Sequence, residues 1–311
     1  MPAVNLVPGV RKKFAYTPFE LTVLASIQGM PPGNVFFVQS TATGATDTAN
    51  AGTKEQPFAT IDYAIGRCTA SKGDVVLVLP GHVETVSGAT SLVLDVAGVA
   101  VIGLGTGKNR PVLDFTNTAG AINISAANTL LANMVLKANV SAVVLGIDVN
   151  AADVELAQLF FTYDATGDDF LTMVDCTTVD RTYMHDNVFE SENAAGGTEA
   201  INLTATNDTV IQNNVFRGNW SDAIIQVTTT LCSRLIISGN IGYNSDTGVY
   251  NGLDTGTLST TGIVADNRIT ALYATAVAKL YRDGDLTSHN NFWCNEVSER
   301  ASTILPATSS G

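Results

Sequence analysis

The chain of 311 residues is long enough for one large all-β domain or two ordinary domains, and 45% of its residues are apolar, enough for a sizeable core. Sixteen basic and 29 acidic residues give a net charge of −13, which disfavours nucleic acids and anionic membranes as partners. The four cysteines are too far apart for a zinc motif and imply no disulfide framework, so we expect neither a metal nor another cofactor.

Residues 1–34 differ in kind from the rest of the chain. They contain scattered Pro and Gly, a basic cluster of Arg11, Lys12 and Lys13, and an apolar run that begins at Phe19. This run has no place in the repeat that follows and would be an exposed patch unless another subunit covers it. We therefore expect an arm that anchors the protein on a partner, or alternatively an extra cap folded over the first coil. The segment lacks the layout of a secretory signal, which predicts a protein made and folded in a reducing cytoplasm.

The next segment, "GTKEQPFATIDYAI" (52–65), combines a turn with a short helical pattern. Apolar residues from Phe58 onward recur at roughly helical spacing, and an apolar strand, Val75–Leu79, follows. We expect a helix within about residues 58–68. Its apolar face would cover the open end of the strand region, because terminal strand edges need a cap.

Seven later segments share one pattern, in which an apolar pair, an amide residue and usually a second apolar pair follow one another. The copies "YMHDNVFESEN" (183–193) and "VIQNNVFRGNW" (210–220) show it most plainly. The amide position recurs at intervals of 23–29 residues, at Asn133, Gln158, Asn187, Asn214, Asn240, Asn267 and Asn290. Short segments with period-two alternation, such as "AINLT" (200–204), precede the first five copies and indicate further strands.

A helix-free repeat of about 26 residues is typical of one coil of a parallel β-helix, in which coils stack at the strand spacing of ~4.8 Å. Stacking places the amide residues in one line, where they can hydrogen-bond one another and the buried corner backbone. We predict a single all-β domain over 35–297 with about eight coils, and an exposed C-terminal tail at 298–311. The amide ladder is expected to be structural and to bind no ligand.

The order of "VFFVQS", "PFATIDYAI" and "GDVVLVLPG" within residues 35–85 resembles the opening of right-handed parallel β-helix proteins of the pectate-lyase-like superfamily. Together with "DVAGVAVIGLGTGKNRPVLDF" (95–115), the run is also similar to virion-associated β-helix proteins of tailed phages and prophages. The resemblance covers about residues 33–295. It implies a right-handed coil, capsid or other virion proteins as partners, and a homotrimer formed side by side around a threefold axis.

Enzymes of this superfamily, as the resemblance implies, use aspartate-held Ca²⁺ with an Arg or Lys base, or paired carboxylates, to cleave polysaccharides. The acidic candidates are Asp164, Asp168, Asp169, Asp175, Asp180 and Asp186. Asp186 and Asp266 occupy equivalent repeat positions, but an intervening coil has Gly239 there. Arg217 and Arg268 lie at different repeat positions. Because no acidic and basic set recurs at stacked positions, the sequence predicts no catalytic residues.

The remaining chemistry-bearing residues favour structural roles. His185 and His289 lie in distant coils and cannot share a metal, while His82 has the surroundings of a turn residue. "GLGTGKNR" (103–110) lacks the Lys-Ser/Thr ending of a phosphate loop. Four aromatic residues offer either a sugar-stacking platform or, as we favour, core and cap packing: Trp220, Trp293, Tyr243 and Tyr273.

The function we predict from these residues is that of a non-enzymatic virion protein. It would be a capsid decoration, cement or fibre component on the exterior of a tailed-phage head. Two alternatives remain open, a polysaccharide-degrading tailspike or lyase and a non-catalytic glycan-binding module with a surface glycan as partner.

Overall fold

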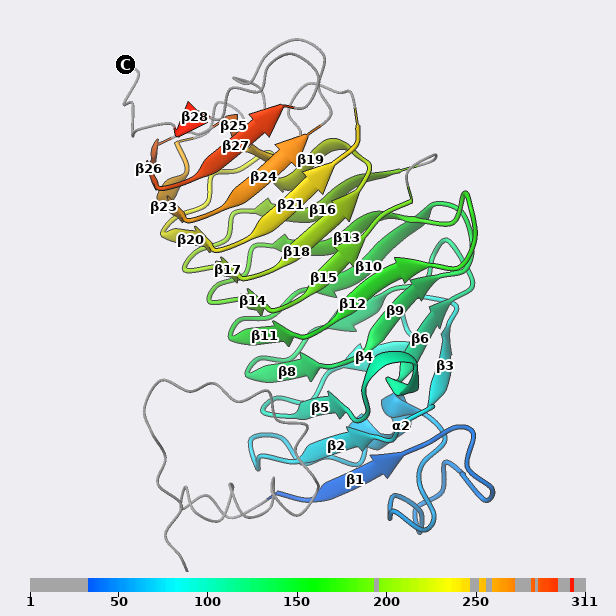
Figure 1. Ribbon diagram of the computed structural model, residues 1–311. Coiled ribbons are helices and arrows are strands. Elements are labelled where there is room, and N and C mark those ends of the chain that lie inside the picture. Colours follow the sequence, from blue (N-terminus) through cyan, green and yellow to red (C-terminus); the bar gives the residue numbers. More distant parts are fainter. Residues whose placement is uncertain are drawn as a thin grey trace, which may run out of the picture.

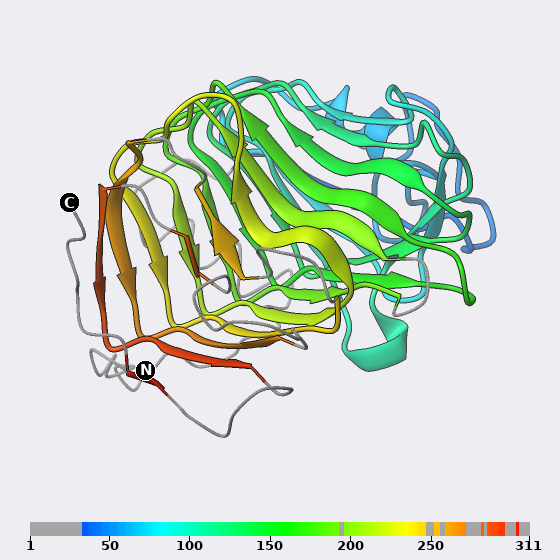
Figure 2. The ribbon, with the colours of Figure 1, turned by 90° about the horizontal axis from the view of Figure 1, so that it is seen from above.

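The protein is a right-handed parallel β-helix in which successive coils stack from the N-terminal to the C-terminal end (Figures 1 and 2). The computed structural model describes residues 33–192, 196–246, 252–255, 259–271, 281–282, 285–295 and 303–304. Within them no helix is both long enough and apolar enough to cross a membrane. The expected arm, apart from its last two residues, and most of the expected tail lie outside the described residues.

Each coil contributes one strand to each of three sheets. Sheet A contains β1 (Val35–Val38), β2 (Val75–Val78), β5 (Ala100–Gly103), β8 (Thr129–Ala132), β11 (Val154–Ala157), β14 (Tyr183–His185), β17 (Val210–Gln212), β20 (Leu235–Ser238), β23 (Thr261–Ala265) and β26 (Asp285–His289). Sheet B contains β3 (Val83–Val86), β6 (Val112–Phe115), β9 (Val135–Ala138), β12 (Phe160–Tyr163), β15 (Val188–Glu190), β18 (Val215–Gly218), β21 (Ile241–Asn244), β24 (Arg268–Ala271), β27 (Phe292–Asn295) and β28 (Thr303–Ile304). Sheet C contains β4 (Leu92–Leu94), β7 (Ile122–Ile124), β10 (Val143–Val149), β13 (Phe170–Thr177), β16 (Gly197–Thr204), β19 (Trp220–Val227), β22 (Leu253–Asp254) and β25 (Tyr281–Arg282).

The core is built from columns of identical or similar side chains, because parallel in-register strands place equivalent residues above one another. On the inner face of sheet B, Phe161, Phe189 and Phe216 stack with ring centroids 4.9 and 4.8 Å apart. Trp220 is fully buried beside Phe216, so this tryptophan packs in the core, as the sequence predicts. The expected sugar platform residue Tyr273 and the side chain of Trp293 lie outside the described residues.

A short helix closes the N-terminal end of the stack, as the sequence predicts, but it is shorter than expected. Helix α2 spans Ile61–Ile65 and begins at Thr60, whose side chain accepts a hydrogen bond from the backbone N–H of Tyr63. The backbone N–H of Gly66 still bonds within the last turn, after which the chain leaves the helix. The buried face of α2 packs against β1, β2 and β4, so the helix covers the first coil (Figure 1).

Five asparagines form a continuous ladder at the corner between sheets A and B. The backbone N–H groups of Asn187, Asn214, Asn240 and Asn267 each donate to the side-chain Oδ1 of the asparagine in the next coil, at 2.9–3.0 Å. Asn291 ends this line, and the side-chain amides donate back to main-chain carbonyls of the preceding coil. All five are buried, so the ladder satisfies corner backbone groups that water cannot reach.

Three residues that the sequence assigns to the ladder lie one position too early. Asn133, Gln158 and Asn290 have φ angles of 56°, 56° and 53°, at the left-handed corner residue that precedes the ladder position. In the first two of these coils the ladder position itself holds buried Met134 and Leu159. The sequence cannot separate the two positions because asparagine tolerates a left-handed φ angle and also suits the ladder. Asparagine is therefore favoured at both corner positions.

Replacing Asn214 by Leu should lower the free energy of unfolding by about 1–3 kcal/mol, because Asn187 and the carbonyl of Met184 lose their buried hydrogen-bond partners. Chemical denaturation followed by circular dichroism measures this loss. The matched control is Asn150→Leu on the exposed surface, for which we expect little change. Equal stability of the two variants would contradict a supporting role for the ladder.

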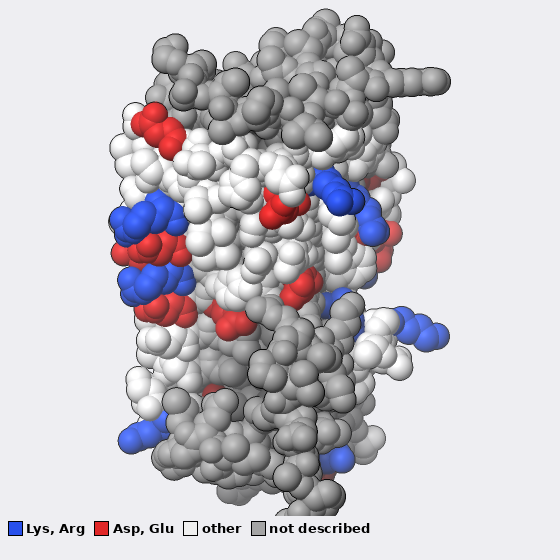
Figure 3. Space-filling view, turned by 60° about the vertical axis from the view of Figure 1, so that its left-hand side comes forward, with Lys and Arg blue, Asp and Glu red and all other residues white. Residues whose placement is uncertain are grey.

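A second column, of alternating charge, runs along the corner between sheets C and A (Figure 3). Arg181 forms a two-pronged ion pair with Asp153 of the preceding coil, with nitrogen–oxygen distances of 2.6 and 2.7 Å. Arg234 pairs in the same way with Asp208, at the same two distances. The hydrogen bond from each arginine is the main cause that holds the pKa of its aspartate below the ordinary range.

Candidate active site

A stripe of polar side chains crosses the outer face of sheet C. We use the name polar stripe for five residues that are register partners on neighbouring strands: Asn123, Asp148, Asp175, Asn202 and Gln226. Each stands between two inward, buried residues of its strand, for example Asp148 between Ile147 and Val149. Because side chains alternate between the two faces of a strand, all five project from the outer face.

Hydrogen bonds fix the centre of the stripe. Asp175 accepts a bond of 2.6 Å from the side-chain amide of Asn202 and one of 3.0 Å from the hydroxyl of Thr177. The oxygen of the Asn202 amide in turn accepts from the hydroxyl of Thr228 at 2.8 Å. This chain of bonds orients the Asn202 amide so that its nitrogen faces Asp175, and both carboxylate oxygens of Asp175 are held in place.

Two further carboxyl groups near Asp175 have pKa values raised above those of ordinary acids. Burial is the main cause that raises the pKa of Asp148, with the charge of Asp175 adding to it and a bond from Asn150 opposing it. Burial also raises the pKa of Glu199, which is 9% exposed, against the opposing 2.7 Å hydrogen bond from Thr172. The site therefore combines a hydrogen-bonded carboxylate with neighbours that retain a proton more readily than an ordinary acid.

The surroundings of these carboxyl groups limit the chemistry that they can perform. Strands β4, β7, β10, β13, β16, β19 and β22 contain no Lys, Arg or His. Within the described residues, no group of three or more His, Cys, Asp or Glu side chains is arranged to hold a metal ion. The arrangement suits proton transfer between carboxyl groups and a bound substrate. The basic residue of sheet C, Arg282 in β25, lies four strands away from Asp175 in the same register row.

The sequence analysis identified one member of this group, Asp175, and missed Asp148 and Glu199. The sequence predicts that no combined acidic and basic set recurs at stacked positions; the structure adds that two carboxyl residues, Asp148 and Asp175, are direct register partners. The expected strands "GIDVN" and "LTMVD" contain both residues, but at the third and the fifth position. The pair could have been found by aligning these strands in a common register. The numbers of residues between the strands vary, and this variation conceals the register.

The other acidic candidates serve local structure. Asp164 forms an ion pair with Lys137 at 2.7 Å, Asp180 accepts from the side chain of Asn207, and Asp186 contacts His185. Asp168 lies in the turn that leads into β13. These residues are spread over separate loops and corners, so the structure brings none of them to the polar stripe.

The histidines also occupy structural positions. His82 ends a turn that begins at Leu79, as the sequence predicts, and its side chain is fully buried. Its Nε2 lies 2.9 Å from Glu84, which also accepts from the backbone N–H of Ile61. This contact ties helix α2 to the first coil. His185 lies between Glu155 and Asp186 on the outer face of sheet A, and hydrogen bonding to Glu155 is the main cause that raises its pKa.

Asp169 is a buried carboxyl group with a pKa raised to about 6, mainly by burial. It accepts hydrogen bonds from the hydroxyl of Ser191 at 2.6 Å and from the backbone N–H groups of Phe170 and Glu192. Because its pKa is raised in the folded state, its contribution to stability is fully present below the ordinary pKa near 4. The contribution is lost as the pH rises through about 6.

We expect the free energy of unfolding to contain a term from Asp169 of up to about 3 kcal/mol that favours the folded state at low pH. The measurement compares wild type with Asp169→Asn by denaturation at pH values from 5 to 8. The stability difference between the two proteins should change across this window, because only the wild type titrates at this position. Parallel pH profiles would contradict an elevated pKa.

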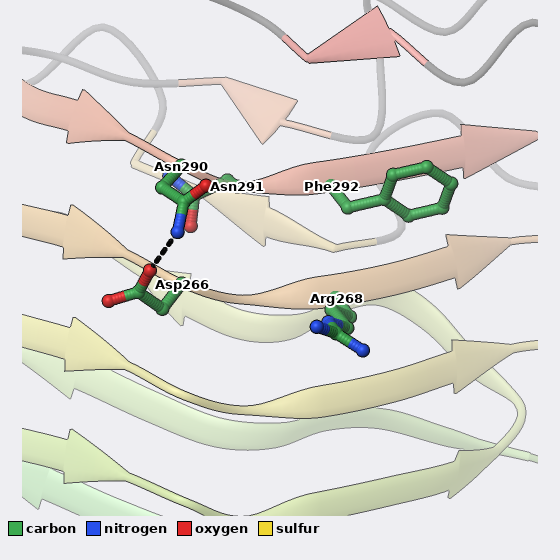
Figure 4. A pocket seen from close by; sticks show the side chains of 5 residues that line it. All are labelled: Asp266, Arg268, Asn290, Asn291 and Phe292. Carbon is green, nitrogen blue, oxygen red and sulfur yellow. Dashed lines mark hydrogen bonds between the residues drawn. The ribbon is translucent and has the colours of Figure 1, made fainter.

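A hollow with a volume of about 370 Å³ lies at the C-terminal end of the stack (Figure 4). It is lined by Asp266, Arg268, Asn290, Asn291 and Phe292. Asn290 donates to Asp266, as the dashed line in Figure 4 marks, and Asn291 belongs to the amide ladder. With a single carboxyl group, this hollow offers no acid and base pair, so we place the candidate active site on sheet C.

A family model described as "Protein of unknown function (DUF1565)" matches residues 43–298. The chain belongs to this family. The match includes the cap helix, all strands of the polar stripe and the hollow of Figure 4. None of the curated proteins matches the chain.

Several solved structures are similar to the chain in fold. A rhamnogalacturonan lyase aligns with a TM-score of 0.47 and 13% identity over 87% of this chain and 84% of that chain. A GH136 lacto-N-biosidase from Eubacterium ramulus aligns with a TM-score of 0.38 and 13% identity over 89% of this chain and 70% of that chain. The fold expected from the sequence, a parallel β-helix, is confirmed by the order and direction of the strands.

These neighbours also require a correction. The sequence analysis predicts a protein without enzymatic activity, whereas the neighbours are a lyase and a glycosidase, both enzymes that act on carbohydrates. The prediction of a non-enzymatic protein is therefore wrong. The prediction considered only a combined acidic and basic set, whereas Asp148 and Asp175 are two carboxyl residues in direct register.

Proposed function

We propose that the protein is a carbohydrate-active enzyme that hydrolyses a neutral glycan bound along the polar stripe. The observation that carries this proposal is the in-register pair of Asp148 and Asp175 on neighbouring strands. Hydrolysis of a glycosidic bond needs one carboxyl group that protonates the leaving oxygen and one carboxylate that acts as base or nucleophile. Asp148, with its raised pKa, is suited to the first role, and hydrogen-bonded Asp175 to the second.

The rest of the stripe supports binding of an extended chain. Its five strands span about 19 Å at the usual strand spacing, which is long enough for a glycan of several units. The side-chain amides of Asn123, Asn202 and Gln226 can both donate to and accept from sugar hydroxyls.

The charge of the face favours a neutral substrate. A polyuronate would bring further carboxylates close to Asp148, Asp175 and Glu199, whereas the basic residue of sheet C, Arg282 in β25, lies four strands from Asp175. A lyase reaction also needs a base and a cation that neutralises the sugar carboxylate, and the strands of the polar stripe supply neither. The polysaccharide lyase considered from the sequence is thus the weaker of the two enzymatic alternatives.

The test is incubation of the purified protein with neutral polysaccharides and, separately, with polygalacturonate and alginate. We expect new reducing ends from at least one neutral glycan and no products with the ultraviolet absorbance of unsaturated sugars. Unsaturated products from an acidic polysaccharide would show that the enzyme cleaves by elimination, and would contradict hydrolysis. Release of no product from any glycan would contradict the proposal.

The virion location and the homotrimer remain predictions from the sequence resemblance. A glycan-cleaving β-helix in that setting would act as a tailspike, with the arm formed by residues 1–34 as its attachment to other virion proteins. Detection of the chain in purified particles, and its mass in solution by light scattering, test these two points independently of the activity.

A further inference from the structure

A second hollow of the described surface, about 230 Å³ in volume, lies on sheet B, outside the polar stripe. Four neighbouring strands form it at their carboxyl ends: β12, β15, β18 and β21. It is lined by Tyr163, Glu190, Ser191, Arg217, Gly218 and Tyr243. Each strand thus supplies one or two residues to a single concave surface.

The hollow exists because small residues lie between two tyrosines. Tyr163 ends β12 and Tyr243 lies in β21, three strand spacings or about 14 Å away. Ser191 and Gly218 occupy the two coils between them. A Cβ atom at Gly218 would approach the Ser191 carbonyl oxygen to 2.4 Å, and the φ angle of Gly218 is 146°. Glycine is therefore required there, because any side chain would collide with Ser191 of the preceding coil.

The floor of the hollow is fixed from below. The hydroxyl of Ser191 donates to buried Asp169 at 2.6 Å, which directs this hydroxyl into the protein and away from the hollow. Asp169 also accepts from the backbone N–H of Glu192, so the turn that follows β15 is held in place. A rigid floor of this kind lowers the entropy cost of binding.

Charged groups of opposite sign lie between the tyrosines. Arg217 donates to Glu190 at 3.2 Å, and both side chains are accessible, with 63% and 29% exposed. Arginine supplies donors and glutamate supplies acceptors, a combination that matches neighbouring hydroxyl groups of a sugar ring. Because the two charges cancel, the hollow favours a neutral ligand over an anion.

We propose that this hollow is a second saccharide-binding site, which takes one neutral sugar ring between Tyr163 and Tyr243. Aromatic side chains bind the apolar face of a ring, while Glu190 and Arg217 bind its hydroxyls. The volume is below that of an ordinary ligand pocket, about 300–1,000 Å³, and so suits a single ring of a longer chain. The inference shares its ligand class with the proposed function but concerns a separate sheet.

The experiment uses the full chain with Asp175→Asn, which prevents turnover, and isothermal titration calorimetry. The probes are six-unit gluco-, galacto-, manno- and N-acetylglucosaminyl oligosaccharides. We expect at least one probe to bind at two sites per chain. Adding Arg217→Ala or Tyr243→Ala should weaken one of the two sites by about tenfold or more, which corresponds to about 1.4 kcal/mol. Tyr243→Phe should retain it, because the ring is kept.

The matched control is Tyr183→Ala, which removes a tyrosine from the outer face of sheet A and should leave both sites unchanged. Thermal melts verify that each variant is folded. A single site that Tyr243→Ala leaves unchanged, no binding of any probe, or two unchanged sites after Tyr243→Ala would overturn the second site. Hydrolysis by the wild type is scored separately, so that failure of the second site and failure of the proposed activity give different results.

Discussion

Replacing Asp175 by asparagine should lower the rate of glycan cleavage by about 10²–10⁴-fold and leave the fold unchanged. Asparagine keeps the size of the side chain, but it has no charge with which to activate water or attack the sugar. The bond from Asn202 would be lost or inverted, yet no buried core residue is disturbed. The measurement is the initial rate of reducing-end release, with circular dichroism to verify folding.

Two companion variants sharpen this result. Asp148→Asn should cause a loss of the same order, because the leaving oxygen would receive no proton. Asp164→Asn is the matched control, an aspartate near the end of sheet B whose ion pair with Lys137 lies away from the stripe, and its rate should equal that of the wild type. Equal rates for Asp175→Asn and Asp164→Asn would contradict the assignment.

The pH profile and the product stereochemistry give independent checks. A general acid must be protonated, so the rate should fall as the pH rises through the raised pKa of Asp148. Neighbouring in-register strands place the Cα atoms of Asp148 and Asp175 about 4.8 Å apart. This spacing is close to the carboxyl separation of retaining glycosidases, about 5–5.5 Å, so the first product should keep its anomeric configuration. Proton NMR of the fresh product decides this point.

Replacing Phe58 by alanine should lower the free energy of unfolding by about 3–5 kcal/mol. Phe58 is 1% exposed, and its ring packs against Tyr63 and Phe36 with centroids 5.1 and 5.8 Å apart. Its backbone exchanges hydrogen bonds with β1 through Phe37 and Gln39. Loss of the ring leaves a cavity between the cap helix and the first strands, which the short α2 cannot fill.

Urea denaturation measures the total loss, and hydrogen exchange locates it. In a solenoid each coil contacts only its neighbours, so exchange should increase in β2 and β5 and hardly in β17 and β20. Glu55→Ala, at an exposed position in the same loop, is the control and should change stability by less than about 0.5 kcal/mol. A loss below 1 kcal/mol for Phe58→Ala would contradict the role of this residue in the cap.

The fold could be predicted because a β-helix repeats its constraints. Asn187, Asn214, Asn240 and Asn267 each satisfy the same corner backbone, so the same residue type returns in each of these four coils and is visible in the sequence. The prediction of individual ladder residues failed where two adjacent corner positions are both suited to asparagine, as at Asn290 and its ladder neighbour Asn291. The sequence contains no information on which of two adjacent asparagines turns inward.

The candidate active site was harder to predict for a different reason. Asp148 and Asp175 occupy outward positions on strands whose side chains alternate between the inner and the outer face. Any solvent-facing polar residue of a strand is found at such a position. Only the register between coils makes them a pair, and loops of varying length between sheets B and C conceal that register. The raised pKa of Glu199 depends in the same way on burial by neighbouring coils, which no local pattern encodes.

The charged column of Asp153, Arg181, Asp208 and Arg234 has a consequence for how the coils find their places during folding. The asparagine ladder is the same in each of its coils, so a coil docked one turn too high or too low would still find an amide partner. The charged column reverses its sign at every step. If one coil docked one position away from its native place in the stack, aspartate would face aspartate and arginine would face arginine. The charged column therefore disfavours a misplaced coil, whereas the asparagine ladder does not.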